Sequence, residues 1–242
     1  MENNEPSSII YKEIKPKGKL LTFVKSFWLF ENNKNEPLNY SILPDGCFDL
    51  IIYFTENNKM EINLTGLWNK KVEVSIPAKT KILAIRFKPI SAEYIVGKNI
   101  INLLNSMVVI SSKDYNFLDQ LNTHFQDFNS FVESNTLKLL SIIATNKIID
   151  ARKVKVFELL FKYNGVISIK ELSERVHWSN RQISRYFGKN YGLSIKKYAN
   201  ILRVNATYND LAKGLHHTKT DFENEEEITY LKNDLKFELG EK

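Results

Sequence analysis

ISIKELSERVHWSNRQISRYFGKNYGLSIKKYANILRV, residues 167–204, contains two helix-start signals in close succession. Ser168 is followed three positions later by glutamate, and Ser179 is followed three positions later by glutamine. In such a capping box the serine hydroxyl caps the helix, and the longer side chain reaches back to the serine amide. Two capped helices with a break of about three residues between them are typical of a helix-turn-helix. The stretch therefore predicts a helix-turn-helix whose second helix covers residues 179–190.

The second helix of this pair has two distinct faces. At 100° per residue, Ile183 and Phe187 point to one side, whereas Arg181, Ser184 and Arg185 point to the other. An arginine can bridge O6 and N7 of guanine, and small neighbours allow close approach to a base pair. The pattern favours entry of this face into a DNA major groove. The alternative is an amphipathic surface helix in an unrelated helical domain.

Further polar residues around the second helix are candidates for contacts with the DNA backbone. Ser194 is expected to cap a third helix, and amides at helix N-termini can hold phosphate groups. Basic side chains at such positions contact phosphates without reading sequence. The additional candidates are Ser179, Asn180, Lys189, Lys196, Lys197 and Arg203.

The positive charge of the chain is concentrated in this region. Residues 1–150 hold 17 Lys and Arg and 16 Asp and Glu, a net charge of +1. Residues 151–214 hold 13 and 4, a net charge of +9, and residues 215–242 hold 4 and 8, a net charge of −4. A basic block is the electrostatic signature of a nucleic-acid binder. A lysine-rich solvated helical face would give the same charge.

The preceding part of the chain reads first as strands and then as helices. Short β-branched and aromatic runs separated by turn residues indicate an antiparallel sandwich or small barrel. They cover residues 9–14, 20–30, 48–54, 61–64, 72–76 and 82–87. Helical spacing follows in Phe117, Leu118, Leu121 and Phe125, and in Leu137, Leu140, Ile143 and Ile148. We therefore expect an α+β fold with a β-rich domain and helical extension over 1–150, an all-α domain over 151–214, and an acidic tail over 215–242.

Several classes of protein are disfavoured by what the chain lacks. No apolar run is long enough for a membrane span, and the N-terminus has no basic start followed by an apolar segment. A single cysteine, Cys47, rules out an internal disulfide and disfavours a zinc site. We expect a cytoplasmic protein that needs no metal or cofactor and is not an enzyme.

At this point the stretch from 167 to 204 resembles the AraC/XylS family of transcription factors, in its first helix-turn-helix and the long helix that follows. The matching residues are Ser179, Arg181, Gln182, Ile183, Arg185, Phe187, Gly192, Ser194, Tyr198 and Arg203. The resemblance implies that Arg181, Ser184 and Arg185 read bases, and that Ile183 and Phe187 are core residues. LPDGCFDLIIYF at 43–54 and ILAIRFKPISAEYIVG at 82–97 are similar to a sensor-like domain of some AraC-type regulators.

Two features depart from this family. His177 stands in the turn where the family usually has glycine. The second helix-turn-helix of the family is missing, because only an acidic segment follows Gly214. A dimer would compensate by presenting two readers. We expect a homodimer through residues 113–149, whose apolar side chains exceed what one helix face needs, although they could equally be core.

Asp45, Asp49 and Arg86 are candidates for binding a small-molecule effector of unknown identity. Asp45 and Asp49 lie close together in the sequence and Arg86 is on a later predicted strand, so the three could line a ligand pocket. The turn at Pro44-Asp45-Gly46 explains the first of them without any ligand.

The function predicted from these observations is sequence-specific binding of double-stranded DNA by a transcriptional regulator of the AraC type. The alternative is a regulator that acts through protein contacts. It would pair with a full-length relative and inhibit it, with weak or no DNA binding of its own.

Overall fold

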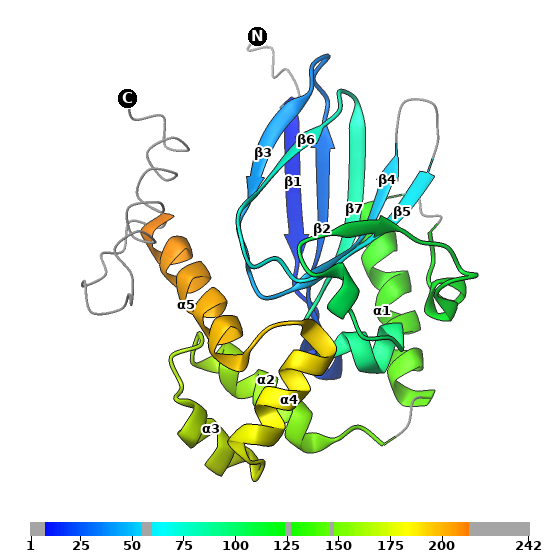
Figure 1. Ribbon diagram of the computed structural model, residues 1–242. Helices are drawn as coiled ribbons and strands as arrows, with labels where there is room; N and C mark the ends of the chain where they lie inside the picture. The colour runs from blue at the N-terminus through cyan, green and yellow to red at the C-terminus, as the bar shows by residue number, and fades with distance from the viewer. Residues whose placement is uncertain (1–7, 55–59, 124–126, 146–147, 213–242) are drawn as a thin grey trace.

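The computed structural model describes residues 8–54, 60–123, 127–145 and 148–212 of the chain. These residues form an antiparallel β-rich part followed by helices (Figure 1). Within these described ranges, all strands precede residue 110 and all α-helices follow residue 127. The fold class is α+β, as the short strands and the later helical periodicity predicted.

Six strands form one antiparallel sheet in the order β1-β2-β7-β4-β5-β8. Their bounds are β1 Ile9–Ile14, β2 Val24–Asn32, β4 Phe48–Phe54, β5 Met60–Thr65, β7 Thr80–Phe87 and β8 Met107–Val109. β7 inserts between two strands that both precede it in the sequence. Nearly all of its residues are buried, which fits a central strand that is covered on both faces.

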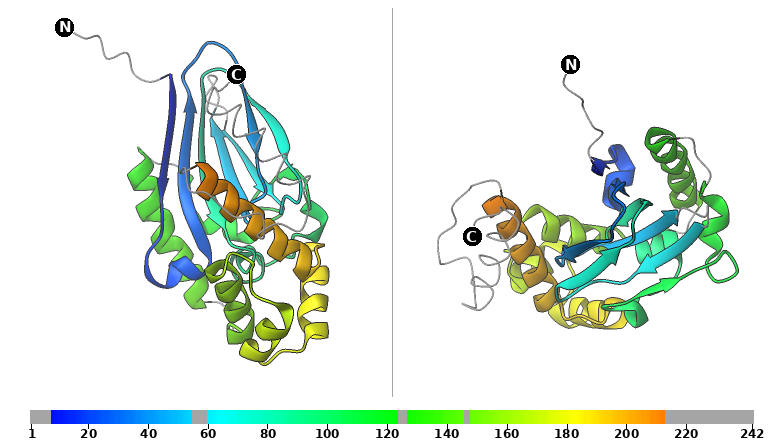
Figure 2. Two further views of the ribbon diagram at one scale, coloured as in Figure 1. Left: turned by 90° about the vertical axis from the view of Figure 1, so that its left-hand side faces the viewer. Right: turned by 90° about the horizontal axis from the view of Figure 1, so that it is seen from above.

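Helix α1 (Phe128–Thr145) covers one face of the six-stranded sheet (Figure 2). Phe131 of α1 meets Phe27 of β2 edge to face, with ring centroids 6.1 Å apart. Leu139 and Ile142 of the same helix are also buried in this core. The helix is therefore anchored by one apolar stripe on the sheet.

A second, two-stranded sheet covers the opposite face. It consists of β3 (Leu38–Ile42) and β6 (Val72–Ile76). Phe30, Ile51 and Ile82 of the large sheet pack with Ile76 in a separate apolar cluster between the two sheets. The β-rich part is thus sandwich-like, with cores on both faces of the large sheet.

The helical end of the molecule consists of four α-helices. They are α2 Ala151–Lys162, α3 Ile169–Val176, α4 Asn180–Tyr191 and α5 Ile195–Ala212. Figure 1 shows α2, α3 and α4 at one end of the sheets. Short helical turns connect the sheets to this end: η1 Gly18–Thr22, the π-helix η2 Ala92–Val96, η3 Ile101–Leu103 and η4 Asn116–Gln120. One apolar cluster runs from the large sheet through α1 to all four of these helices.

Several predicted elements differ from the observed ones. The strand expected over 20–30 is two elements, because η1 occupies the start and β2 begins only at Val24. The short strands β3 and β8 were not predicted. β8 exposes all three of its residues and β3 buries none of its five, so neither shows the apolar signal of a core strand.

The helical periodicity was only partly right. Phe117 and Leu118 lie in the 3₁₀-helix η4 rather than in an α-helix. In α1 the buried stripe includes Phe131 and Leu139, whereas Leu137 is 71% exposed. Ile148 lies beyond α1 and is 98% exposed, and Phe125 lies outside the described residues.

The burial of these apolar residues within one chain weakens the argument for the predicted dimer. Phe117 is buried, and Leu121 and Ile143 pack against the same core of the chain. Most of the apolar side chains between 113 and 149 therefore pack within the chain itself. The homodimer stays a prediction. The domain bounds also stay a prediction, and the tail over 215–242 lies outside the described residues.

Candidate nucleic-acid interface

Helices α3 and α4 are joined by the short turn that the sequence predicts. Ser168 caps α3 by accepting a hydrogen bond from the Glu171 amide at 3.1 Å. The expected return bond is replaced, because the Glu171 carboxylate forms an ion pair with Arg175 at 2.6 Å. The helix ends at His177, which adopts left-handed backbone angles (φ 53°, ψ 45°). This reversal turns the chain directly into the next helix.

Helix α4 begins with a complete capping box. The Ser179 hydroxyl accepts a hydrogen bond from the Gln182 amide, and the Gln182 side-chain oxygen accepts one from the Ser179 amide at 2.9 Å. Both bonds satisfy amides that a helix start otherwise leaves without partners. Ser179 therefore has a structural role at the start of the helix, whatever else it contacts.

The two faces of α4 separate as predicted. Ile183 and Phe187 are 0% exposed, whereas Arg181, Ser184 and Arg185 are all exposed to solvent. No ion pair of the described residues includes either arginine. The helix thus presents two free guanidinium groups on a face that the rest of the described chain leaves open.

An aromatic cluster fixes α4 against the neighbouring helices. The Phe157 ring of α2 lies 5.4 Å from that of Phe187, which lies 5.3 Å from the Tyr198 ring of α5. Aromatic pairs at such distances add to the energy of burial. The outward face of α4 is therefore presented from a rigid base, which a base-reading helix needs.

The remaining predicted DNA contacts lie around α4 and at the start of α5. Asn180, Lys189 and Lys197 are exposed, and so is Lys196. Arg203 is half-buried and donates to the side-chain oxygen of Asn200 at 2.9 Å. Arg203 is therefore less available to a phosphate than Lys189 and Lys197.

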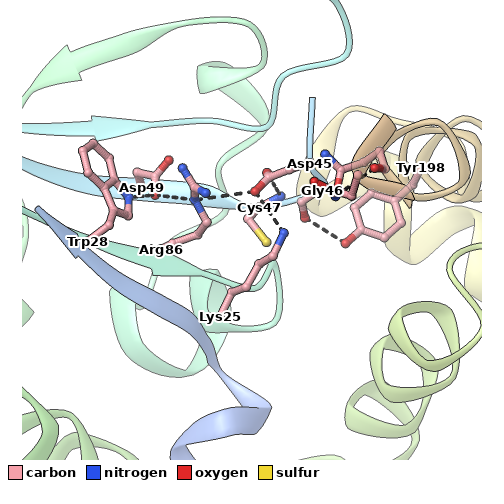
Figure 3. Close-up of polar contacts among 10 residues, drawn as sticks. Lys25, Trp28, Asp45, Gly46, Cys47, Asp49, Arg86 and Tyr198 are labelled. Atoms are coloured by element: carbon pink, nitrogen blue, oxygen red, sulfur yellow. Dashed lines mark hydrogen bonds and ion pairs between the residues drawn. The ribbon is translucent and has the colours of Figure 1, made fainter. Parts of the chain in front are cut away.

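The turn before β4 docks on helix α5. The Tyr198 hydroxyl donates to the Gly46 carbonyl at 2.8 Å in a buried position, and Figure 3 shows this contact. A Cβ atom at Gly46 would lie 2.6 Å from Leu202 Cδ2, and φ at this glycine is +74°. Only glycine fits both the close approach and the left-handed backbone. The turn thus joins the β-rich part to the helical end.

A second polar contact joins η2 to the helical end. The carboxylate of Glu93 forms an ion pair with Lys153 of α2, and it accepts a hydrogen bond from the Tyr186 hydroxyl at 3.3 Å. Burial raises the pKa of Tyr186, so its phenol stays protonated and donates. Sequence reasoning missed Glu93 and Lys153, because partners 60 residues apart leave no local signal.

The three candidate ligand residues do come together, in an ion network at the start of β4 (Figure 3). Arg86 Nε lies 3.1 Å from Asp49 and 3.5 Å from Asp45. Lys25 Nζ lies 3.1 Å from Asp45, and the Trp28 indole donates to Asp49 at 3.1 Å. Each carboxylate already has partners within the chain, so the contacts favour a structural role over effector binding.

The two carboxylates of this network differ in acidity. Burial disfavours the charge on Asp45, but Arg86 and Lys25 outweigh that effect and hold the pKa of Asp45 below its ordinary 3.8. Burial raises the pKa of Asp49 above 3.8, and Arg86 offsets the rise only in part. Asp45 is therefore the more strongly held anion, and it also fixes the turn by accepting from the Cys47 amide at 2.9 Å.

A domain of unknown function, DUF6597, matches residues 12–109, which is the β-rich part from β1 to β8. No curated protein matches the chain. Within the described residues, no helix combines the length and apolar character that crossing a membrane requires.

Among solved structures, the chain is similar to ToxT from Vibrio cholerae at 11% identity and a TM-score of 0.37, with 95% of this chain and 93% of that chain covered. It is similar to unsaturated fatty acid bound wild-type ToxT at 12% identity and a TM-score of 0.36, covering 96% and 91%. An apo variant of ToxT matches at 10% identity and a TM-score of 0.38, covering 96% and 93%.

Proposed function

We propose that this protein is a DNA-binding transcriptional regulator that inserts α4 into the major groove of double-stranded DNA. The observation that carries the proposal is the open face of Arg181, Ser184 and Arg185 on a capped helix. Its opposite side, at Ile183 and Phe187, is fully buried. A buried face that fixes the helix and an open face that carries two arginines are together what a base-reading helix requires.

The chemistry of this face supports base recognition. A guanidinium group donates two parallel hydrogen bonds to O6 and N7 of guanine, and each such pair contributes about 1–3 kcal/mol of discrimination. Ser184 and Gly188 lie beside the arginines and are exposed. Their small size lets the helix backbone approach the base edges closely.

Basic residues at the start of α5 support backbone contacts. Lys196 and Lys197 are exposed in its first turn, where Ser194 caps the helix by accepting from the Lys197 amide at 3.1 Å. Contacts to phosphate oxygens position a protein on the duplex and carry no sequence information. The two lysines would therefore contribute affinity, and the two arginines specificity.

The test starts from selection of a preferred duplex out of a random-sequence pool, followed by titration of the selected and a scrambled duplex. Arg185→Ala should weaken binding to the selected duplex by about 1–3 kcal/mol and change the scrambled duplex much less. Lys197→Ala is the matched control. It should weaken both duplexes alike and reduce the slope of log K against log salt by about 0.9.

Equal binding of wild type and Arg185→Ala would contradict the proposed function. If wild type and Arg185→Ala bind both duplexes equally, then α4 does not read bases. A regulator that acts through protein contacts would then be the better account of the chain.

A further inference from the structure

A hollow of about 350 Å³ lies beside α4, on the side that faces the β-rich part. Its lining includes Lys153 of α2, Arg185 and Lys189 of α4, and Glu93 of η2. The rings of Trp178 and Tyr186 also line it, with their centroids 5.3 Å apart. Helices α2 and α4, the turn between α3 and α4, and η2 of the β-rich part therefore contribute to one site.

The charges in this hollow are unbalanced. Three cations face one carboxylate, and Glu93 is already engaged by Lys153 and Tyr186. Arg185 and Lys189 are exposed and take part in no ion pair of the described residues. The hollow thus has a net positive charge and two cations that remain available to an added anion.

The position of the hollow on α4 relates it to the base-reading face. Arg185 and Lys189 are four residues apart, so their side chains lie on the same flank of the helix. At 100° per residue, Lys189 lies between Arg185 of the outward face and Tyr186 of the buried face. When a helix enters the major groove, the sugar-phosphate backbone runs past such a flank.

We propose that this hollow is a phosphate-binding site and that Glu93 is an internal anion that competes for it. Lys153 is held by Glu93 in the free protein, and a bound phosphate would draw Lys153 away from it. Lys189 would complete the site, and Arg185, which also lines the hollow, remains the group that α4 directs at bases under the proposed function. A phosphate group in this position could belong to the DNA backbone or to a small phosphorylated molecule. The alternative in which the phosphate belongs to DNA rests on the proposed function.

The DNA arm measures binding of a mixed-sequence duplex by fluorescence anisotropy over a series of salt concentrations. Lys189→Ala should weaken binding and lower the slope of log K against log salt by about 0.9. Glu93→Gln keeps the shape and the acceptor for Tyr186. It should tighten binding about two- to fivefold, the range expected for releasing a lysine from one exposed ion pair. Lys155→Ala is the matched control, because Lys155 is on α2 outside the hollow.

The second arm uses inorganic phosphate at constant ionic strength, with amide shifts of residues 182–190 followed by NMR. Wild type should show saturable shifts, Lys189→Ala should need more phosphate, and Glu93→Gln should need less. Saturation by phosphate without any effect of these variants on DNA would assign the site to a small phosphorylated molecule. Effects in both arms would assign it to the DNA backbone.

The site and the proposed function can fail separately. If Lys189→Ala and Glu93→Gln leave both DNA affinity and phosphate binding unchanged, the phosphate site is overturned. Loss of sequence preference in Arg185→Ala would still support base reading by α4 in that case. If Arg185→Ala keeps the sequence preference of wild type, the proposed function is overturned. The phosphate titration would still test the phosphate site in that case.

Discussion

At the residue scale, His177 adopts a left-handed backbone conformation that glycine would adopt at a lower free-energy cost. Its left-handed backbone disfavours a residue with a Cβ atom by roughly 1–2 kcal/mol, and its side chain is exposed. Glycine loses more entropy on folding, about 0.5–1 kcal/mol. His177→Gly should therefore raise the free energy of unfolding by up to about 1 kcal/mol, as measured by urea denaturation.

A matched control exists at Asn164, which has a similar φ of 47°. Asparagine tolerates the left-handed region better than histidine, so Asn164→Gly should gain less stability. An equal gain in both variants, or no gain in His177→Gly, would show that the turn has no strain to relieve.

Residue-scale signals are also where the sequence was most informative. The serine caps at 168 and 179 and the two faces of α4 depend on neighbours within four positions, so one sequence suffices to predict them. One local interaction was nevertheless predicted incorrectly. Glu171 pairs with Arg175 one turn later instead of completing the first capping box.

At the element scale, the two carboxylates at the start of β4 should change the free energy of unfolding in opposite directions as the pH falls. Because the folded-state pKa of Asp45 lies below 3.8, its charge stabilises the fold above that pH. This contribution is lost as the pH falls below about 3.8. The folded-state pKa of Asp49 lies above 3.8, so the fold takes up that proton first and gains stability as the pH falls toward 3.8.

The two contributions can be separated by isosteric variants. Asp49→Asn should abolish the rise in the free energy of unfolding that wild type shows as the pH falls toward about 3.8. Asp45→Asn should abolish the decrease that wild type shows as the pH falls further. Urea denaturation between pH 7 and pH 3 measures both. If the two variants have pH profiles parallel to wild type, neither carboxylate has the shifted acidity that the ion network implies.

Elements that depend on distant partners were beyond sequence reasoning. The strand β3 has a mixed burial pattern and is stabilised by pairing with β6, 30 or more residues later. The insertion of β7 between β2 and β4 follows from pairing across the sheet and not from any local signal. For the same reason the candidate site was predicted without Glu93 and Lys153, whereas α4 itself was predicted correctly.

At the scale of the whole molecule, the shared apolar core predicts cooperative unfolding. One buried cluster includes Phe27 of β2, Phe131 of α1 and Leu202 of α5. Separate unfolding of the helical end would expose this surface, so β7 and α4 should open together. Hydrogen exchange under native conditions should give their amides the same opening free energy.

A core variant sharpens this measurement. Leu202→Ala removes buried methyl groups from the joint between both parts, which costs about 2–5 kcal/mol. It should lower the opening free energies of β7 and α4 equally. Opening of α4 at a markedly lower free energy than β7 in wild type would mean that the two parts unfold as independent units.

The contact between Gly46 and Tyr198 also dictates an order of events during synthesis. The two residues are 152 positions apart. At about 5–20 residues per second, a ribosome needs roughly 8–30 s to make the intervening chain. The nascent sheet is therefore complete well before α5 emerges to cover the Gly46 turn. During that interval the Gly46 turn lacks the cover that Tyr198 and Leu202 give it in the folded chain, so slow translation or stalling there would favour aggregation.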